Sequence, residues 1–117
     1  MKSCGWNDIK EDVIGPLAGR RVLHGTHLTV ARFRFDKGNE VVMHHHVNDQ
    51  VTMVQTGSLR MVVGDSEMIL KAGDIVHVEP DVPHGNIALE DSVVVEVFSP
   101  VREDWLKADA SRPSGKT

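Results

Sequence analysis

The chain has 117 residues, which is enough for one domain with a single hydrophobic core. Its formal net charge of -4 argues against nucleic acid as the main partner, because phosphate binding needs a basic surface. Cys4 is the only cysteine, so an internal disulfide and a cysteine-rich zinc site are both excluded.

Residues 1–20 show no clear periodic pattern. Residues 1–12 contain no apolar run, and we therefore expect neither a signal peptide nor a transmembrane segment, with the cytoplasm as the compartment. Trp6 and Ile9 could anchor a short strand. We interpret residues 1–20 as an N-terminal arm that precedes the main domain at residues 21–107.

Short strands separated by turns account for most of the main domain. Valine is abundant, and prolines and glycines recur at regular intervals, which is typical of β-structure. Apolar or alternating runs predict strands over residues 26–35, 40–46, 50–56, 58–63, 67–70, 75–79, 86–89 and 93–98. We expect turns at residues 36–39, 64–65 and 71–74, and a loop at residues 80–83, because two prolines cannot lie in a central ladder.

Evenly spaced strands of this kind predict an all-β fold, namely a small antiparallel sandwich or barrel. The interior mouth of such a barrel is the natural place for a ligand. After Pro100, residues 103–106 could form a short helical turn. Residues 108–117 are polar and contain Pro, Gly and Ser, so we expect them to be a disordered tail.

Three consecutive histidines, His44 to His46, provide a candidate metal site. In an extended strand, residues i and i+2 point to the same face, so His44 and His46 can aim at one point while His45 aims away. Gln50 offers a side-chain oxygen four residues later, and His84 is a further candidate after the loop at residues 80–83. Two imidazoles with a nearby oxygen form half of a transition-metal site.

Two spaced patterns resemble the motifs of a known family. One stretch is similar in every spacing to the first cupin motif: Gly38-x5-His44-x-His46-x3-Gln50-x6-Gly57. Another is similar to the second cupin motif: Gly73-Asp74-x4-Glu79-Pro80-Asp81-x-Pro83-His84. The family usually has Glu at Gln50, Pro at Glu79 and Gly at Asp81, and an asparagine is common at Ala88. The resemblance implies a cupin jelly roll, also called a double-stranded β-helix.

A narrower resemblance covers residues 88–106, which look like the C-terminal signature of the pectin degradation protein family KdgF. These small cupins also carry Gln at the position of Gln50. They convert 4,5-unsaturated monouronates, the products of pectate and alginate lyases, into open-chain 5-keto-4-deoxyuronate. The resemblance implies a small anionic sugar acid as substrate, no membrane partner, and a homodimer in which residues 1–20 are a candidate for exchange between subunits.

The same resemblance implies roles for individual residues. One divalent transition metal, such as Zn, Ni, Fe or Mn, would be held by His44, His46, Gln50 and His84. Glu96 stands where the family typically has a catalytic Asp, so the acid/base role is carried over with one additional methylene group. Phe98 and Arg102 match the remaining site residues of the family.

The proposed ligands are all neutral, because they are three imidazoles and an amide. A metal held by them keeps nearly its full positive charge and acts as a strong Lewis acid toward an anionic substrate. Three nitrogens and one oxygen favour Zn, Ni, Fe or Cu over Ca or Mg. Thr52 and Val54 share the strand face of Gln50, and we expect both to line the substrate pocket.

Glu96 interrupts an apolar strand, where an ionised carboxylate is costly unless it has a function. It shares one strand face with Val94 and Phe98, and if this face is interior, Glu96 points toward the metal. We expect it to move the proton of the anomeric hydroxyl or of the enol. The planar fork of Arg102 suits the substrate carboxylate.

Other interpretations remain open on sequence alone. The chain could be a non-catalytic cupin that binds a small anionic sugar or metabolite as a sensor, or a cupin dioxygenase or isomerase. Gln50 could orient a water molecule instead of binding metal, Glu96 could face solvent, and Arg102 could be a solvated charge. The sequence names neither the metal nor the choice between pectin-derived and alginate-derived substrates.

Overall fold

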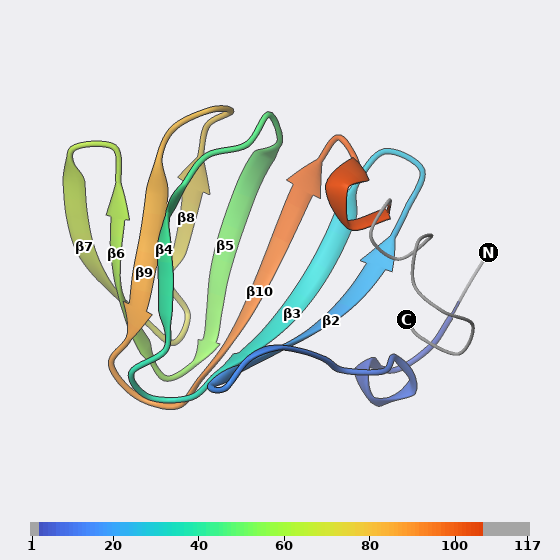
Figure 1. Cartoon of the computed structure of the whole chain (residues 1–117), viewed down its shortest axis with the longest axis horizontal. Helices are drawn as coiled ribbons and strands as arrows, with labels where there is room; N and C mark the ends of the chain where they lie inside the picture. Colours follow the sequence, from blue (N-terminus) through green and yellow to red (C-terminus); the bar gives the residue numbers. More distant parts are fainter. Residues whose placement is uncertain (1–2, 107–117) are drawn as a thin grey trace.

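The computed structural model describes residues 3–106, which form two antiparallel sheets packed against each other (Figure 1). The larger sheet contains, in spatial order, β1 (Asp12–Gly15), β2 (Ala18–His24), β3 (Thr29–Phe35), β10 (Ser92–Ser99), β5 (Asp49–Thr56) and β8 (Ile75–Val78). The smaller sheet contains β4 (Glu40–His44), β9 (His84–Ala88), β6 (Ser58–Val63) and β7 (Ser66–Lys71). A 3₁₀ segment, η1 (Trp6–Asp8), precedes β1.

The predicted all-β jelly roll is confirmed, although the two sheets stay separate rather than closing into a continuous barrel. Residues 103–106 form the expected helical turn after β10. The predicted tail at residues 108–117 lies outside the described residues. Within residues 3–106, no helix is long and apolar enough to cross a membrane.

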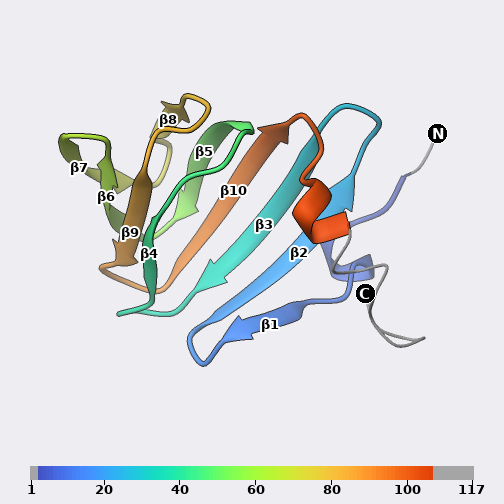
Figure 2. The same ribbon diagram turned by 45° about the horizontal axis from the view of Figure 1, so that its top comes forward.

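The hairpin of β1 and β2 was not predicted, and it lies alongside β3 of the same chain (Figure 2). The predicted boundary after residue 20 therefore falls inside β2. The alternation of apolar and polar residues is interrupted at Gly19, Arg20 and Arg21. The segment is a strand because it pairs with β3, and its own strand propensity is not sufficient. A Cβ atom at Gly19 would overlap the carboxylate of Glu11, so a larger residue there would require the Glu11 side chain to move.

The core lies between the two sheets and follows the alternation of side chains along each strand. On β3, the residues that point inward are all buried: Thr29, Ala31, Phe33 and Phe35. From the smaller sheet, Leu59 and Met61 are completely buried against this face. Full burial of a side chain of this size stabilises the fold by about 1.5–3 kcal/mol. The apolar core therefore holds the sheets at a fixed separation, on which the site below depends.

Gly57 joins β5 to β6 with a φ of +83°, and a Cβ atom there would overlap Ser92 Oγ and the carbonyl oxygen of Asp91. Gly73 has a similar φ of +94°, but a Cβ atom would meet nothing within 4 Å. We predict that Gly57→Ala lowers the free energy of unfolding by about 3 kcal/mol, from left-handed strain and overpacking together. Gly73→Ala should cost only about 1–2 kcal/mol from the strain. Urea denaturation of both variants checks this, and equal losses would contradict it.

Candidate metal and substrate site

Three histidines meet at one end of the space between the sheets. His44 on β4 lies directly opposite His84 on β9, and the two ring centroids are 4.3 Å apart. The His46 ring lies 5.0 Å from that of His84, and one ring nitrogen from each of the three histidines lies within 4.8 Å of the others. The strand expected over residues 40–46 ends at His44, so His46 comes from the loop between β4 and β5. The three histidines therefore converge because β4 pairs with β9 and because the loop after β4 positions His46, and not because they share one strand face.

Each of these histidines directs its Nδ1 atom at a backbone carbonyl. The His44 Nδ1 lies 2.8 Å from the Val42 oxygen, and the His84 Nδ1 lies 2.8 Å from the Val82 oxygen. Since a carbonyl only accepts hydrogen bonds, Nδ1 carries the proton and Nε2 keeps a lone pair for a metal. Within residues 3–106, the His84 Nε2 atom is buried without a hydrogen-bond partner, as expected of a ligand atom.

His46 is placed between two oxygen atoms. Its Nδ1 lies 3.1 Å from the Asn48 carbonyl oxygen, and its Nε2 lies 2.9 Å from Oε1 of Gln50. A neutral imidazole has one N–H and can donate to only one of these oxygens. A cation bound to both Nε2 of His46 and Oε1 of Gln50 would satisfy the other pair, so the donor set fits a transition metal.

Burial favours the neutral form of the His46 and His84 imidazoles, the form that a metal requires. Removal from water lowers the pKa of His84 to about 4. The pKa of His46 is also lowered, first by burial and then by the positive charge of Arg102. Near neutral pH both residues are therefore available as ligands without losing a proton first.

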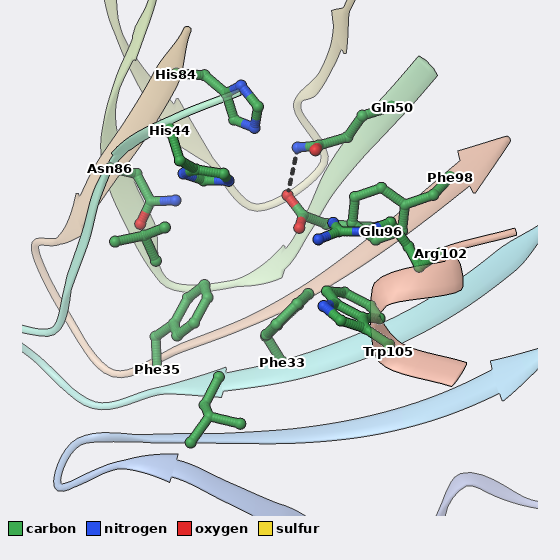
Figure 3. Close-up of a pocket in the computed structure, with 12 residues that line it drawn as sticks. Phe33, Phe35, His44, Gln50, His84, Asn86, Glu96, Phe98, Arg102 and Trp105 are labelled. Atoms are coloured by element: carbon green, nitrogen blue, oxygen red, sulfur yellow. Dashed lines mark hydrogen bonds between the residues drawn. The ribbon is translucent and has the colours of Figure 1, made fainter. Parts of the chain in front are cut away.

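Gln50 contacts both His46 and Glu96, and Figure 3 shows its hydrogen bond to Glu96. Its Nε2 donates to Oε2 of Glu96 at 2.9 Å, and the Thr52 hydroxyl donates to the same oxygen at 2.6 Å. Strand register causes this contact, because β10 places Glu96 opposite Thr52 of β5. Burial raises the pKa of Glu96 to about 7, while the Thr52 hydrogen bond and the Arg102 charge act to lower it. Glu96 thus points into the site and not to solvent.

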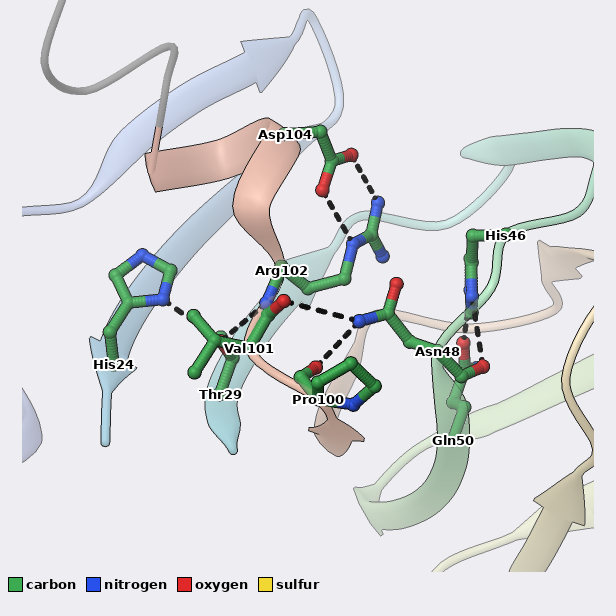
Figure 4. Close-up of polar contacts among 9 residues, drawn as sticks. All are labelled: His24, Thr29, His46, Asn48, Gln50, Pro100, Val101, Arg102 and Asp104. Carbon is green, nitrogen blue, oxygen red and sulfur yellow. Dashed lines mark hydrogen bonds and ion pairs between the residues drawn. The ribbon is translucent and has the colours of Figure 1, made fainter. Parts of the chain in front are cut away.

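Arg102 is fixed from several directions (Figure 4). Its backbone N–H donates to Oγ1 of Thr29 at 3.0 Å, and its Nε and Nη2 donate to the Asp104 carboxylate at 3.0 and 2.7 Å. The guanidinium carbon lies 4.1 Å from the centre of the Trp105 ring and 4.8 Å from that of Phe98. Arg102 is 8% exposed, so it is a buried, oriented cation rather than a solvated charge.

His44, Gln50, His84, Glu96 and Arg102 line a cavity of about 130 Å³, and His46 is not among its lining residues. Aromatic side chains form one wall, and the predicted Phe98 is among the lining residues: Ile14, Phe33, Phe35, Val41, His44, Gln50, His84, Asn86, Glu96, Phe98, Arg102 and Trp105. Thr52 and Val54 were expected to line it but do not. Thr52 is buried beneath Gln50 and Glu96, and Val54 belongs to the apolar core, because the cavity occupies only one end of the sheet face.

Sequence reasoning missed several residues that shape the site. Asn48 donates to the carbonyl oxygen of Pro100 at 2.6 Å and so ties the loop that carries His46 to the segment that carries Arg102. Asp104 orients the guanidinium of Arg102. Its position two residues after Arg102 could have indicated this ion pair from the sequence. Asn86, two residues after His84 on one strand face, could have been found by the same alternation that relates Glu96 to Phe98.

Comparisons with known proteins agree on one family. Residues 31–99 match the family model Cupin_2, described as a cupin domain. The pectin degradation protein KdgF of Dickeya dadantii (strain 3937) is 38% identical over 74 residues, which are 62% of this chain and 67% of that protein.

Solved structures give the same result. KdgF from Halomonas sp. is similar with a TM-score of 0.80 and 28% identity, over 85% of this chain and 94% of that chain. An RmlC-like cupin from Shewanella frigidimarina NCIMB 400 gives a TM-score of 0.82 and 33% identity, over 88% of this chain and 93% of that chain.

We predict that His84→Ala abolishes stoichiometric metal binding, because it removes a buried ligand atom from the centre of the cluster. Loss of a residue that only orients a metal ligand typically lowers metal affinity by roughly 10–100-fold, so we expect loss of the ligand itself to lower it by about 100-fold or more. His45→Ala is the matched control, since His45 is exposed and lies next to the same cluster. Metal content after dialysis, measured by mass spectrometry, checks this. Equal metal content in both variants would contradict it.

Proposed function

The chain belongs to the cupin domain family Cupin_2, and from this premise we propose that it is a metal-dependent enzyme that opens the ring of 4,5-unsaturated monouronates. The product is the open-chain 5-keto-4-deoxyuronate. Similarity to two KdgF proteins, one of them named for pectin degradation, supports this substrate class. The observation that carries the proposal is the position of Glu96, a carboxylate held inside the cavity between the histidine cluster and Arg102.

The metal would be held by His44, His46 and His84, with Oε1 of Gln50 as the fourth ligand. A divalent ion such as Zn, Ni, Fe or Mn supplies Lewis acidity toward a substrate oxygen, undiminished because every ligand is neutral.

Arg102 would bind the substrate carboxylate. Asp104 occupies its Nε and Nη2 atoms along one edge, so the opposite edge of the guanidinium can donate to a second carboxylate. The guanidinium of Arg102 lies over the rings of Phe98 and Trp105, and these contacts limit its rotation. The substrate ring is thereby held beside Glu96, with the aromatic wall excluding water from the reacting atoms.

Glu96 would act as the acid/base. It removes the proton of the anomeric hydroxyl, C1 becomes an aldehyde, and the bond from C1 to the ring oxygen breaks. The bonding electrons leave with the ring oxygen, which becomes the enolate at C5. Return of the proton to C4 converts the enol to the 5-keto group, so the reaction is an isomerisation without any second substrate.

The direct test mixes metal-loaded protein with an unsaturated monouronate and follows the absorbance of the conjugated double bond. Ring opening and ketonisation remove this conjugation, so the absorbance must fall faster than in the spontaneous reaction. A rate equal to the spontaneous rate would refute the proposed function.

We predict that Glu96→Gln lowers kcat by about 10²–10⁴-fold, the typical contribution of a general acid or base. The amide oxygen can still accept from Thr52 and Gln50, so metal content and fold should be unchanged. Glu67→Gln, at an exposed position of β7, is the matched control and should behave as wild type. Wild-type turnover by Glu96→Gln with metal retained would rule out this role.

We predict that Arg102→Lys raises KM by about tenfold and changes kcat less, because Lys keeps the charge but cannot form a two-point contact with a carboxylate. Arg32→Lys on the outer face of β3 is the control. Steady-state kinetics on the unsaturated uronate separate the two constants. An unchanged KM would show that Arg102 does not bind the substrate carboxylate.

A further inference from the structure

The carboxamide of Asn86 has no role in the chemistry above. Asn86 lies on β9 two residues after His84, so both side chains project from the same strand face. Both residues line the same cavity, and Figure 3 shows Asn86 on the same side as His44. The smaller sheet therefore presents a polar group to the ligand space beside the metal ligands.

Within its own sheet, Asn86 lies opposite two apolar residues, Val41 of β4 and Met61 of β6. Its Oδ1 atom is buried, and among residues 3–106 it has no hydrogen-bond partner, a property it shares with Nε2 of His84. Leaving a buried polar atom unsatisfied destabilises a protein, and Asn is disfavoured in strands. Phe35 and Val41 line the same cavity and offer no hydrogen bond. Folding alone does not account for Asn here, whereas a ligand would.

The cavity has two polar ends. Arg102 follows β10 of the larger sheet and Asn86 belongs to the smaller sheet, and Figure 3 places them on opposite sides with Glu96 and His44 between. A ligand that fills the cavity thus meets a cation at one end and a carboxamide at the other. A carboxamide donates and accepts hydrogen bonds, as a sugar hydroxyl does. The side chain can present either atom by turning about its last bond, which is soft in Asn.

We propose, building on the function above, that Asn86 binds a hydroxyl group of the substrate while Arg102 binds its carboxylate. Asn86 is then a specificity-determining residue. The site takes hydroxylated ring monocarboxylates and binds carboxylates of the same size without hydroxyls less well. Such selection works because a polar group built to bond a hydroxyl is left unpaired by the analogue that lacks it.

The test is calorimetric titration of the metal-loaded protein with two probes. Galacturonate has a six-membered ring with hydroxyls and a carboxylate, whereas cyclohexanecarboxylate keeps the ring and carboxylate only. Asn86→Leu and Asn86→Ala should weaken galacturonate binding by about fivefold, the value of one neutral hydrogen bond, and change cyclohexanecarboxylate binding by less than about twofold. Asn7→Leu, the same change at an exposed site outside the cavity, should alter neither.

Equal losses for both probes would mean that Asn86 only shapes the cavity, and unchanged galacturonate binding would mean that it makes no contact; either result overturns the proposal. Asn86→Ala adds no volume and decides the outcome where Asn86→Leu fails to fold. The wild-type protein could fail to turn over the unsaturated uronate while the Asn86 variants still lose galacturonate binding selectively. This result would contradict the proposed reaction and support the role of Asn86 in hydroxyl binding. The two failures are therefore distinguishable.

Discussion

The orientation of the Gln50 carboxamide is the constraint on which the rest of the site depends. Its nitrogen must face Glu96, because the amide nitrogen is the group that can donate to a carboxylate. The oxygen is then forced toward His46 and the histidine cluster. Reversing the amide would set its oxygen against the Glu96 carboxylate. One buried side chain thus connects the proposed metal ligands to the proposed acid/base, Glu96.

The two sheets supply different parts of this site, and the apolar core holds their inner faces at a constant separation. The smaller sheet contributes His44 and His84 as a cross-strand pair, and the larger sheet contributes Gln50 and Glu96 from adjacent strands. Polar groups inside the cavity reduce stability, because Glu96 carries a carboxyl group out of water. Completely buried side chains such as Leu59 offset this loss. The residues that folding alone would not select are those to which we assign metal and substrate binding.

From residue 26 onward, the sequence determined where the strands lie along the chain and most of their limits, because turn residues and period-2 alternation are local signals. It also determined which residues share a strand face, so alternation alone was enough to group Glu96 with Phe98. The β1–β2 hairpin escaped prediction, because only pairing with β3 makes residues 18–24 a strand. Local pattern likewise placed His46 on a strand, whereas it lies in a loop.

Only the tertiary structure decided which faces meet. The register of β10 against β5 sets Glu96 opposite Thr52, and the pairing of β4 with β9 sets His44 opposite His84. Alternation along one strand cannot specify these relations, because they depend on contacts between segments far apart in the sequence. For the same reason, Val54 shares a face with Gln50 yet belongs to the core, while Asn86 reaches the cavity.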